Sequence, residues 1–191
     1  MTSGRGVPES NVTPFKTACI AVSVLIFASG CAMTSAEPAR TAATTIVATA
    51  TLRDVAGHEV GKAELRQAAG WSIAIGVSGQ TSGAHGIHLH TVGACDAPDF
   101  ASAKGHLNPD GRQHGSANPA GMHQGDIPNL EVGADGTASV SLPLSSTLDM
   151  AQLFDADGTA IVIHAGADDY RTDPSGNSGG RVACGVLRRA V

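Results

Sequence analysis

Seven side chains that can bind metal recur at short spacings between residues 88 and 164. Histidine is the commonest metal ligand because a neutral ring nitrogen binds copper or zinc at neutral pH, and a carboxylate oxygen completes a zinc site well. A lone histidine in a strand is more often a polar group satisfied by a hydrogen bond. Apolar periodicity does not explain the seven positions as a set, which occur in or beside segments rich in Gly, Pro and Asn, and the set therefore predicts metal binding. Its members are His88, His90, His106, His114, His123, Asp126 and His164.

Alternation of apolar residues with period two dominates the body of the chain, and helical periodicity is nearly absent. The pattern recurs in residues 46–52, 71–77, 140–144, 161–163 and 182–186. Between these runs, Asp135-Gly136 and Asp157-Gly158 are typical of tight hairpin turns, and Trp71 is interpreted as packing rather than as a ligand. We expect an all-β fold, an eight-stranded Greek-key β-sandwich or flattened barrel of immunoglobulin-like form.

Two long stretches, 91–128 and 165–180, interrupt the strands and are rich in Gly, Pro, Asn, Asp and Ser. Loops of this length are uncommon in a compact domain unless they are functional or pinned. The first stretch carries four of the seven expected ligands together with Cys95. We therefore expect two long functional loops that hold metal on the outer face of the sheet.

The other three expected ligands lie on strands, and alternation places them on the strand face that points away from the core. His88 and His90 share one face of a strand, while the apolar residues that alternate with them point into the core. His164 ends the apolar strand 160–163, on the face opposite Ile161 and Ile163. Three ligands are thus expected on rigid strands and four on loops.

The N-terminus has the composition of an export signal. Residues 1–30 combine a polar, basic start with an apolar run at 18–27, which is too short to span a bilayer because a span needs about 20 apolar residues. Cys31 follows small residues and resembles the lipidated cysteine of bacterial lipoproteins. The alternative is ordinary cleavage near Ala32 or Ala36, which would leave a soluble secreted protein. Residues 31–43 are expected to form a flexible tether, and residues 44–191 one domain.

The net charge and the cysteines indicate which binding partners and which cellular compartment to expect. The formal net charge of −5 argues against nucleic acid, whose binding calls for a basic face. With Cys19 in the signal and Cys31 lipidated, Cys95 and Cys184 remain, and two cysteines outside the cytoplasm are expected to pair. Two separate buried thiols are the alternative.

Five motifs together resemble the Cu/Zn superoxide dismutase family over most of residues 44–191. They are GIHLH at 86–90, GHLNP at 105–109, H-x-G-D at 123–126, VIHAGADD at 162–169 and GGRVACGVL at 179–187. Each motif alone is weak, whereas the combination is specific.

The resemblance implies a ligand set for each metal. Copper would be bound by His88, His90, His106 and His164. Zinc would be bound by His106, His114, His123 and Asp126, so His106 would bridge the two metals. Copper would perform the redox chemistry, and redox-silent zinc would hold the loops.

The resemblance also implies roles for residues beside the metals. Arg181 would attract and orient the superoxide anion, and Asp168 would link His88 to His114, although the adjacent Asp169 competes for that assignment. His85 would support the copper strand by hydrogen bonding. Cys95 and Cys184 match the family's disulfide, and His58 matches nothing.

The implied activity is dismutation of superoxide to oxygen and hydrogen peroxide, with His106 alternating between bridging ligand and proton carrier. The protein would then protect the cell envelope from the periplasmic or outer side, held at the membrane by its lipid. Alternatives are a metal-binding or copper-delivery module without turnover and a structural surface lipoprotein. Eukaryotic members of the family often have lysines in the second long loop that steer the substrate; here this loop contains no lysine, although Arg171 could substitute. The sequence leaves homodimerisation open.

Overall fold

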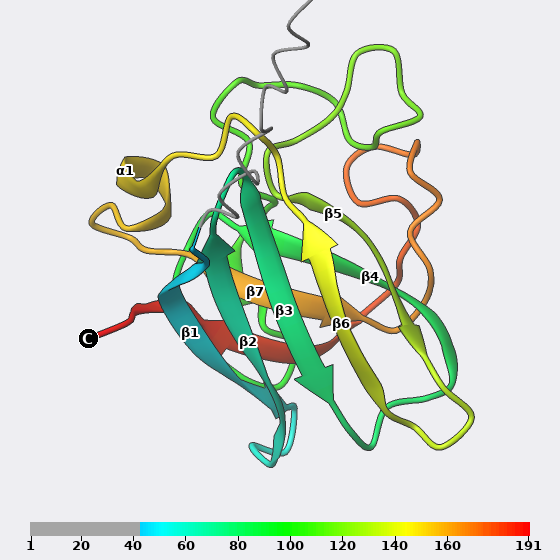
Figure 1. Cartoon of the computed structure of the whole chain (residues 1–191). Coiled ribbons are helices and arrows are strands. Elements are labelled where there is room, and N and C mark those ends of the chain that lie inside the picture. The colour runs from blue at the N-terminus through cyan, green and yellow to red at the C-terminus, as the bar shows by residue number, and fades with distance from the viewer. Residues whose placement is uncertain (1–42) are drawn as a thin grey trace, which may run out of the picture. The chain divides into compact units, whose positions relative to one another are not determined.

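The structure is a computed structural model that describes residues 43–191; the expected signal, most of the tether and Cys31 lie outside these residues. Eight antiparallel strands follow one another in the order β5-β4-β7-β8-β1-β2-β3-β6 and form a nearly closed barrel, while the short β9 pairs with β1. Figure 1 shows β1, β2, β3 and β6 in one layer, with β4, β7 and β8 behind them. The expectation of an all-β, eight-stranded fold is confirmed.

The strand bounds follow. They are β1 (Thr45–Asp54), β2 (Glu59–Gln67), β3 (Trp71–Val77), β4 (Gly83–His90), β5 (Asp126–Val132), β6 (Ala138–Pro143), β7 (Ala160–His164), β8 (Arg181–Val186) and β9 (Arg188–Arg189). Two short helices accompany them, η1 (Ala101–Ala103) and α1 (Met150–Leu153).

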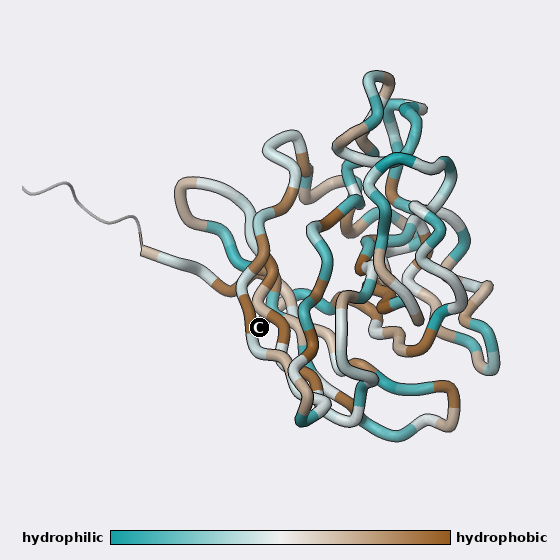
Figure 2. The backbone as a smooth tube through the Cα atoms, turned by 90° about the vertical axis from the view of Figure 1, so that its right-hand side faces the viewer, coloured by the Kyte–Doolittle hydropathy of each residue, from teal (hydrophilic) through white to brown (hydrophobic). Residues whose placement is uncertain are grey.

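Alternate residues of the two layers form the main core. In β3, Ile73, Ile75 and Val77 are buried, while Trp71 at the strand's start is half-buried and packs against the core, as predicted. Ile75 lies opposite Ala63 of β2, which is fully buried. Each large aliphatic side chain buried in this way contributes about 1.5 to 3 kcal/mol. Figure 2 shows hydrophobic segments recurring within the strands and more hydrophilic colour in the connecting loops.

β7 and β8 are buried on both faces. Ala160 and Val162 of β7 face a second, smaller cluster with Phe100 and Cys184, beneath the first long loop. In β8, Ala183 belongs to the main core, whereas its neighbour Cys184 lies in the second cluster. Alternation is uninformative in such a strand because apolar residues are favoured on both of its covered faces.

Two sequence expectations about loops are wrong in detail. β5 begins at Asp126, so the first loop ends at 125 rather than 128. Pro128 and Asn129 disfavour a strand, but Pro is tolerated on an edge strand, and pairing with β4 decides the conformation. Asp135-Gly136 does close the β5–β6 hairpin, with φ +75° at Gly136. Asp157-Gly158 instead lies between α1 and β7 and closes no hairpin.

A disulfide joins the first long loop to β8. Cys95 and Cys184 are bonded, with their Cα atoms 5.7 Å apart and 89 positions apart in sequence, as expected. The bond holds the loop over the face of the sheet that carries the second cluster. No helix within residues 43–191 is long and apolar enough to cross a membrane.

Removing the disulfide should destabilise the fold without changing its strands. We expect Cys95→Ser to lower the free energy of unfolding by about 4 kcal/mol, because the bond constrains a long loop in the unfolded chain. Denaturant unfolding of the parent and the variant measures the change. Addition of a reductant should bring the parent to the stability of the variant and leave the variant unchanged; equal stability of the two oxidised proteins would contradict the prediction.

Candidate metal centre

Strands β4 and β7 deliver three histidines to one face. His88 and His90 alternate with Ile87 and Leu89, which are fully buried in the main core, so both imidazoles point to the opposite side of the layer. His164 is the last residue of β7, which pairs with β4. The structure therefore brings these three residues together as the alternation predicts.

The first long loop adds His106 by extending the sheet beyond the end of β4. His106 forms an isolated antiparallel bridge with His90. The Leu107 N–H donates to the Leu89 carbonyl over 2.8 Å, and the Gly125 N–H donates to the Leu107 carbonyl over 2.9 Å. These backbone bonds fix a loop residue as firmly as a strand residue, and they bring the 106 and 125 segments side by side.

Two overlapping groups of metal-ligating side chains result. Within each group the ligand atoms all lie within 4.8 Å of one another. The first group is His88, His90, His106 and His164, and the second contains His88, His106, His114 and Asp126. Every one of these side chains is buried. The stacked rings of His88 and His106, with centroids 3.9 Å apart, connect the two groups.

The first group presents unpartnered ring nitrogens. Nδ1 of His88 and Nε2 of His90, His106 and His164 are buried and have no hydrogen-bond partner in the described protein. Burial is the largest cause that lowers the pKa of His88 to about 3, of His90 to about 2 and of His164 to about 4. Neutral imidazoles whose lone pairs converge in this way suit copper.

The second group surrounds one carboxylate oxygen. Asp126 Oδ1 lies 3.0 Å from Nδ1 of His106, 3.0 Å from Nδ1 of His114 and 3.2 Å from Nδ1 of His123. A tetrahedral zinc with ligand distances of about 2.0–2.1 Å implies ligand separations of about 3.3 Å. The residues therefore fit zinc, and His123 is the fourth member of this set by distance, because the Nδ1 of His88 already faces the first group.

Asp168 connects the two groups through the histidine ring nitrogens that point away from the clustered ligand atoms. Its carboxylate accepts hydrogen bonds from Nε2 of His88 over 2.8 Å and from Nε2 of His114 over 2.9 Å. Burial alone would raise the pKa of Asp168, but the hydrogen bonds from His114 and His88 hold it well below its usual range. Asp169 is exposed and bonds Thr172 within its own loop, so the contacts assign the linking position to Asp168.

Sequence reasoning missed the residues that hold Asp168. The Asn129 side chain donates to the Asp168 carbonyl over 3.0 Å and accepts from the Asp168 N–H over 2.9 Å. The Tyr170 hydroxyl accepts the Asn129 N–H over 2.7 Å. A Cβ at Gly176, where φ is +62°, would lie 1.8 Å from Asp168 Oδ1, so this position requires glycine. The available signal was an amide in the interior of a strand, where Asn is disfavoured.

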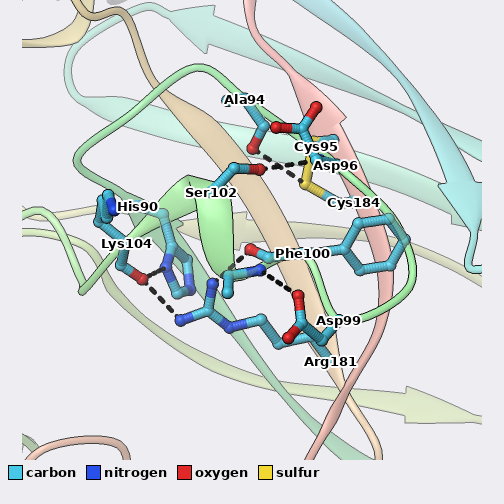
Figure 3. Close-up of a disulfide and its surroundings, with 11 residues drawn as sticks. His90, Ala94, Cys95, Asp96, Asp99, Phe100, Ser102, Lys104, Arg181 and Cys184 are labelled. Atoms are coloured by element: carbon cyan, nitrogen blue, oxygen red, sulfur yellow. Dashed lines mark hydrogen bonds between the residues drawn. A yellow bond between two sulfur atoms is a disulfide. The ribbon is translucent and has the colours of Figure 1, made fainter.

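Arg181 lies beside the first group, held by backbone carbonyls. Its Nη1 donates to the Phe100 carbonyl and its Nη2 to the Lys104 carbonyl, each over 2.6 Å. The Lys104 carbonyl also accepts Nδ1 of His90 over 2.9 Å, so the guanidinium and this histidine share one acceptor (Figure 3). Figure 3 also places Phe100 and Lys104 in the loop that the disulfide fastens. The guanidinium is thus fixed beside the first group of histidines.

The two remaining histidines lie outside both groups. Nδ1 of His85 donates to the His164 carbonyl over 2.7 Å, so His85 ties β4 to the end of β7. Its Nε2 lies 2.8 Å from the Thr81 carbonyl oxygen and 3.2 Å from the Thr81 hydroxyl. His58 is exposed in the β1–β2 turn and bonds Asp54 over 3.1 Å.

Comparisons with known proteins agree with this geometry. The family model described as copper/zinc superoxide dismutase (SODC) matches residues 59–187. Superoxide dismutase [Cu-Zn] 1 of Aquifex aeolicus is 46% identical over 138 residues, covering 69% of this chain and 82% of the relative. Superoxide dismutase [Cu-Zn] of Caulobacter vibrioides is 39% identical over 148 residues, covering 74% and 85%.

Solved structures show the same fold. A superoxide dismutase-like protein from Bacillus subtilis superposes with a TM-score of 0.69 at 40% identity, covering 76% of this chain and all of that one. Cu/Zn superoxide dismutase from Brucella abortus gives a TM-score of 0.63 at 28% identity over the same shares. With the family model spanning more than half of the chain, this protein belongs to the copper/zinc superoxide dismutase family.

Proposed function

We propose that this protein is a Cu/Zn superoxide dismutase that converts two superoxide anions and two protons into oxygen and hydrogen peroxide. The observation that carries the proposal is the position of Arg181 beside four buried histidines whose free ring nitrogens converge. A module that only stores metal has no need of a fixed cation at that point. Relatives named superoxide dismutase, at 39% to 46% identity, support the same activity.

We assign copper to His88, His90, His106 and His164, and zinc to His106, His114, His123 and Asp126. Copper bound there would supply redox chemistry by accepting an electron from one superoxide and returning it to another. The donor sets support the assignment, because the first is all imidazole and the second adds a carboxylate.

His106 is proposed as the bridge and the proton carrier. In the other five histidines of the two sets, one ring nitrogen is bonded to a carbonyl or to Asp168 and the second faces the cluster. His106 has no such outer acceptor: Nδ1 lies beside Asp126, and Nε2 faces the first group unpartnered. Both of its nitrogens are therefore available to the two sites, and Nε2 is where a proton would be held.

Substrate binding is assigned to Arg181. Its guanidinium keeps a permanent charge and is fixed by two carbonyls, so it can attract and orient a small anion without itself rearranging. The disulfide supports this role indirectly, since it fastens the loop that supplies both carbonyls.

Replacing Arg181 tests the proposed activity. The full chain is loaded with copper and zinc, and superoxide removal is measured per bound copper. We expect Arg181→Ala to lower the rate about tenfold, because the local positive field is lost. Arg66→Ala, which removes an arginine paired with Glu64 on β2, should leave the rate unchanged.

Two results would overturn parts of the proposal. If the parent removes superoxide no faster than free copper, the enzyme assignment is wrong and a non-catalytic metal-binding or copper-delivery module replaces it. If the parent is active and Arg181→Ala is equally active, only the role of Arg181 is wrong.

Replacing Asp168 tests the link between the two metal sites. We expect Asp168→Asn to weaken zinc binding about 10- to 100-fold, because the amide cannot accept from both His88 and His114. Competition with a chromogenic chelator measures the affinity, independently of activity. Asp169→Asn is the matched control, with an affinity close to that of the parent; a larger loss in this variant than in Asp168→Asn would reverse the assignment.

We also propose that residues 1–30 are an export signal, that Cys31 carries lipid, and that residues 31–43 tether the 44–191 domain outside the cytoplasm, where it protects the envelope. The disulfide supports an oxidising compartment. Sedimentation of the purified mature chain tests the open expectation of a homodimer.

Palmitate labelling tests the anchor. We expect the full-length protein to incorporate labelled palmitate in a bacterial host and to fractionate with membranes, and Cys31→Ser to do neither. Cys19→Ser, which alters a cysteine inside the expected signal, should be labelled like the parent. Equal labelling of the parent and Cys31→Ser would exclude lipidation at that residue.

A further inference from the structure

Lys104 has a backbone conformation that favours glycine. It follows η1 with φ +64° and ψ −146°, and its backbone N–H bonds the Ala101 carbonyl. A side chain at this combination of angles is strained, because the Cβ crowds the backbone in a region that glycine alone adopts freely. Strain of this kind persists where the residue serves a purpose that glycine would not.

The backbone contacts of Lys104 explain why its backbone adopts this conformation, but they do not explain why the residue is a lysine. The carbonyl accepts from Nδ1 of His90 and from Nη2 of Arg181, and glycine would offer the same carbonyl without strain. Lys104 is an exposed residue, in contrast to the buried His90 beside it. What lysine adds is a hydrated ammonium on a flexible stem, attached to backbone that touches the active-site arginine.

The net negative charge of the domain makes a local positive charge useful for attracting an anion. Residues 43–191 contain nine Lys or Arg and fifteen Asp or Glu, so the domain as a whole repels an anion. The second long loop contributes Asp168, Asp169 and Asp173 and has no lysine. The only other lysine of the described residues, Lys62, lies on β2 in the other layer and pairs with Glu59 over 3.8 Å.

We propose that Lys104 is a substrate-steering residue, whose ammonium raises the local concentration of superoxide beside Arg181. Steering acts over about one Debye length, which is about 30 Å at 0.01 M ionic strength and about 8 Å at 0.15 M. The inference rests on the proposed dismutase activity. The charges of bound metals act on the anion in every variant, so differences between variants report the side chain.

The first arm of the test removes the charge and keeps the strain. Lys104→Gln and the matched control Lys62→Gln are loaded with copper and zinc, and rates per bound copper are measured from about 0.01 to about 0.15 M ionic strength. We expect Lys104→Gln to be about twofold slower at the lowest ionic strength, with a shallower decline as salt rises. Lys62→Gln should follow the parent throughout.

The second arm removes both the charge and the strain. Lys104→Gly should raise the Tm by about 3 °C, because glycine adopts the native backbone angles freely. Its rate should nevertheless fall like that of Lys104→Gln. A gain in stability together with a loss in rate distinguishes a steering role from a purely structural one.

Azide binding separates this proposal from the proposed activity. The affinity of the copper-loaded protein for azide, an anionic probe, is read from visible absorption and requires no turnover. We expect weaker azide binding in Lys104→Gln at low ionic strength and none of this weakening in Lys62→Gln. An inactive parent would refute the dismutase activity, while azide still decides the role of Lys104. Equal rates and equal azide affinities in Lys104→Gln and the parent would overturn the proposal, as would a Lys104→Gly variant with the full rate.

Discussion

Except in His106, the outer ring nitrogens of the centre's histidines are bonded to fixed acceptors, and the site depends on these bonds. His88 and His114 share Asp168, His90 bonds the Lys104 carbonyl, and His164 bonds the Gly179 carbonyl. Each bond sets which nitrogen carries the proton and which faces inward. A buried polar atom without a partner costs about 1 to 3 kcal/mol, so lone pairs converge in this number only where a cation offsets that cost.

The acceptors themselves are held by the fold. Asp168 is clamped by Asn129 of β5, and the Lys104 carbonyl is aimed by a strained backbone in the loop that the disulfide fastens. Two long loops with little regular structure are thereby held in place by side-chain hydrogen bonds and by the disulfide. The functional loops extend from one layer of the barrel, and its packed core supplies the rigid reference that they need.

Electrostatics connect this architecture to the proposed substrate. The domain carries more acidic than basic residues, yet the Arg181 guanidinium bonds the backbone carbonyl of Lys104, so the two basic residues are neighbours. A local field of this kind can guide a small anion even when the net charge is unfavourable. It also explains why a glycine-like position can retain a lysine.

Sequence alone predicted the fold class, the inward row of β3, most of the inward row of β1, and the seven ligand types. It did so because alternation with period two is a local property, and because a set of several imidazole and carboxylate side chains has few functions other than metal binding. It failed where neighbours decide. β5 forms despite Pro128 and Asn129 because β4 pairs with it, and Ile46 is exposed because the pairing of β1 with β2 shifts register between Ile46 and Ala48.

The pairing of ring nitrogens with acceptors was likewise decided only by the tertiary structure. His88 and Asp168 are 80 positions apart, and Asn129 is 39 positions from Asp168, so no local pattern connects them. The sequence by itself determined which residues can bind metal and on which face of a strand they lie. The tertiary structure decided which nitrogen is free, which residue is shared and where the cations lie, because those properties arise from contacts between distant segments.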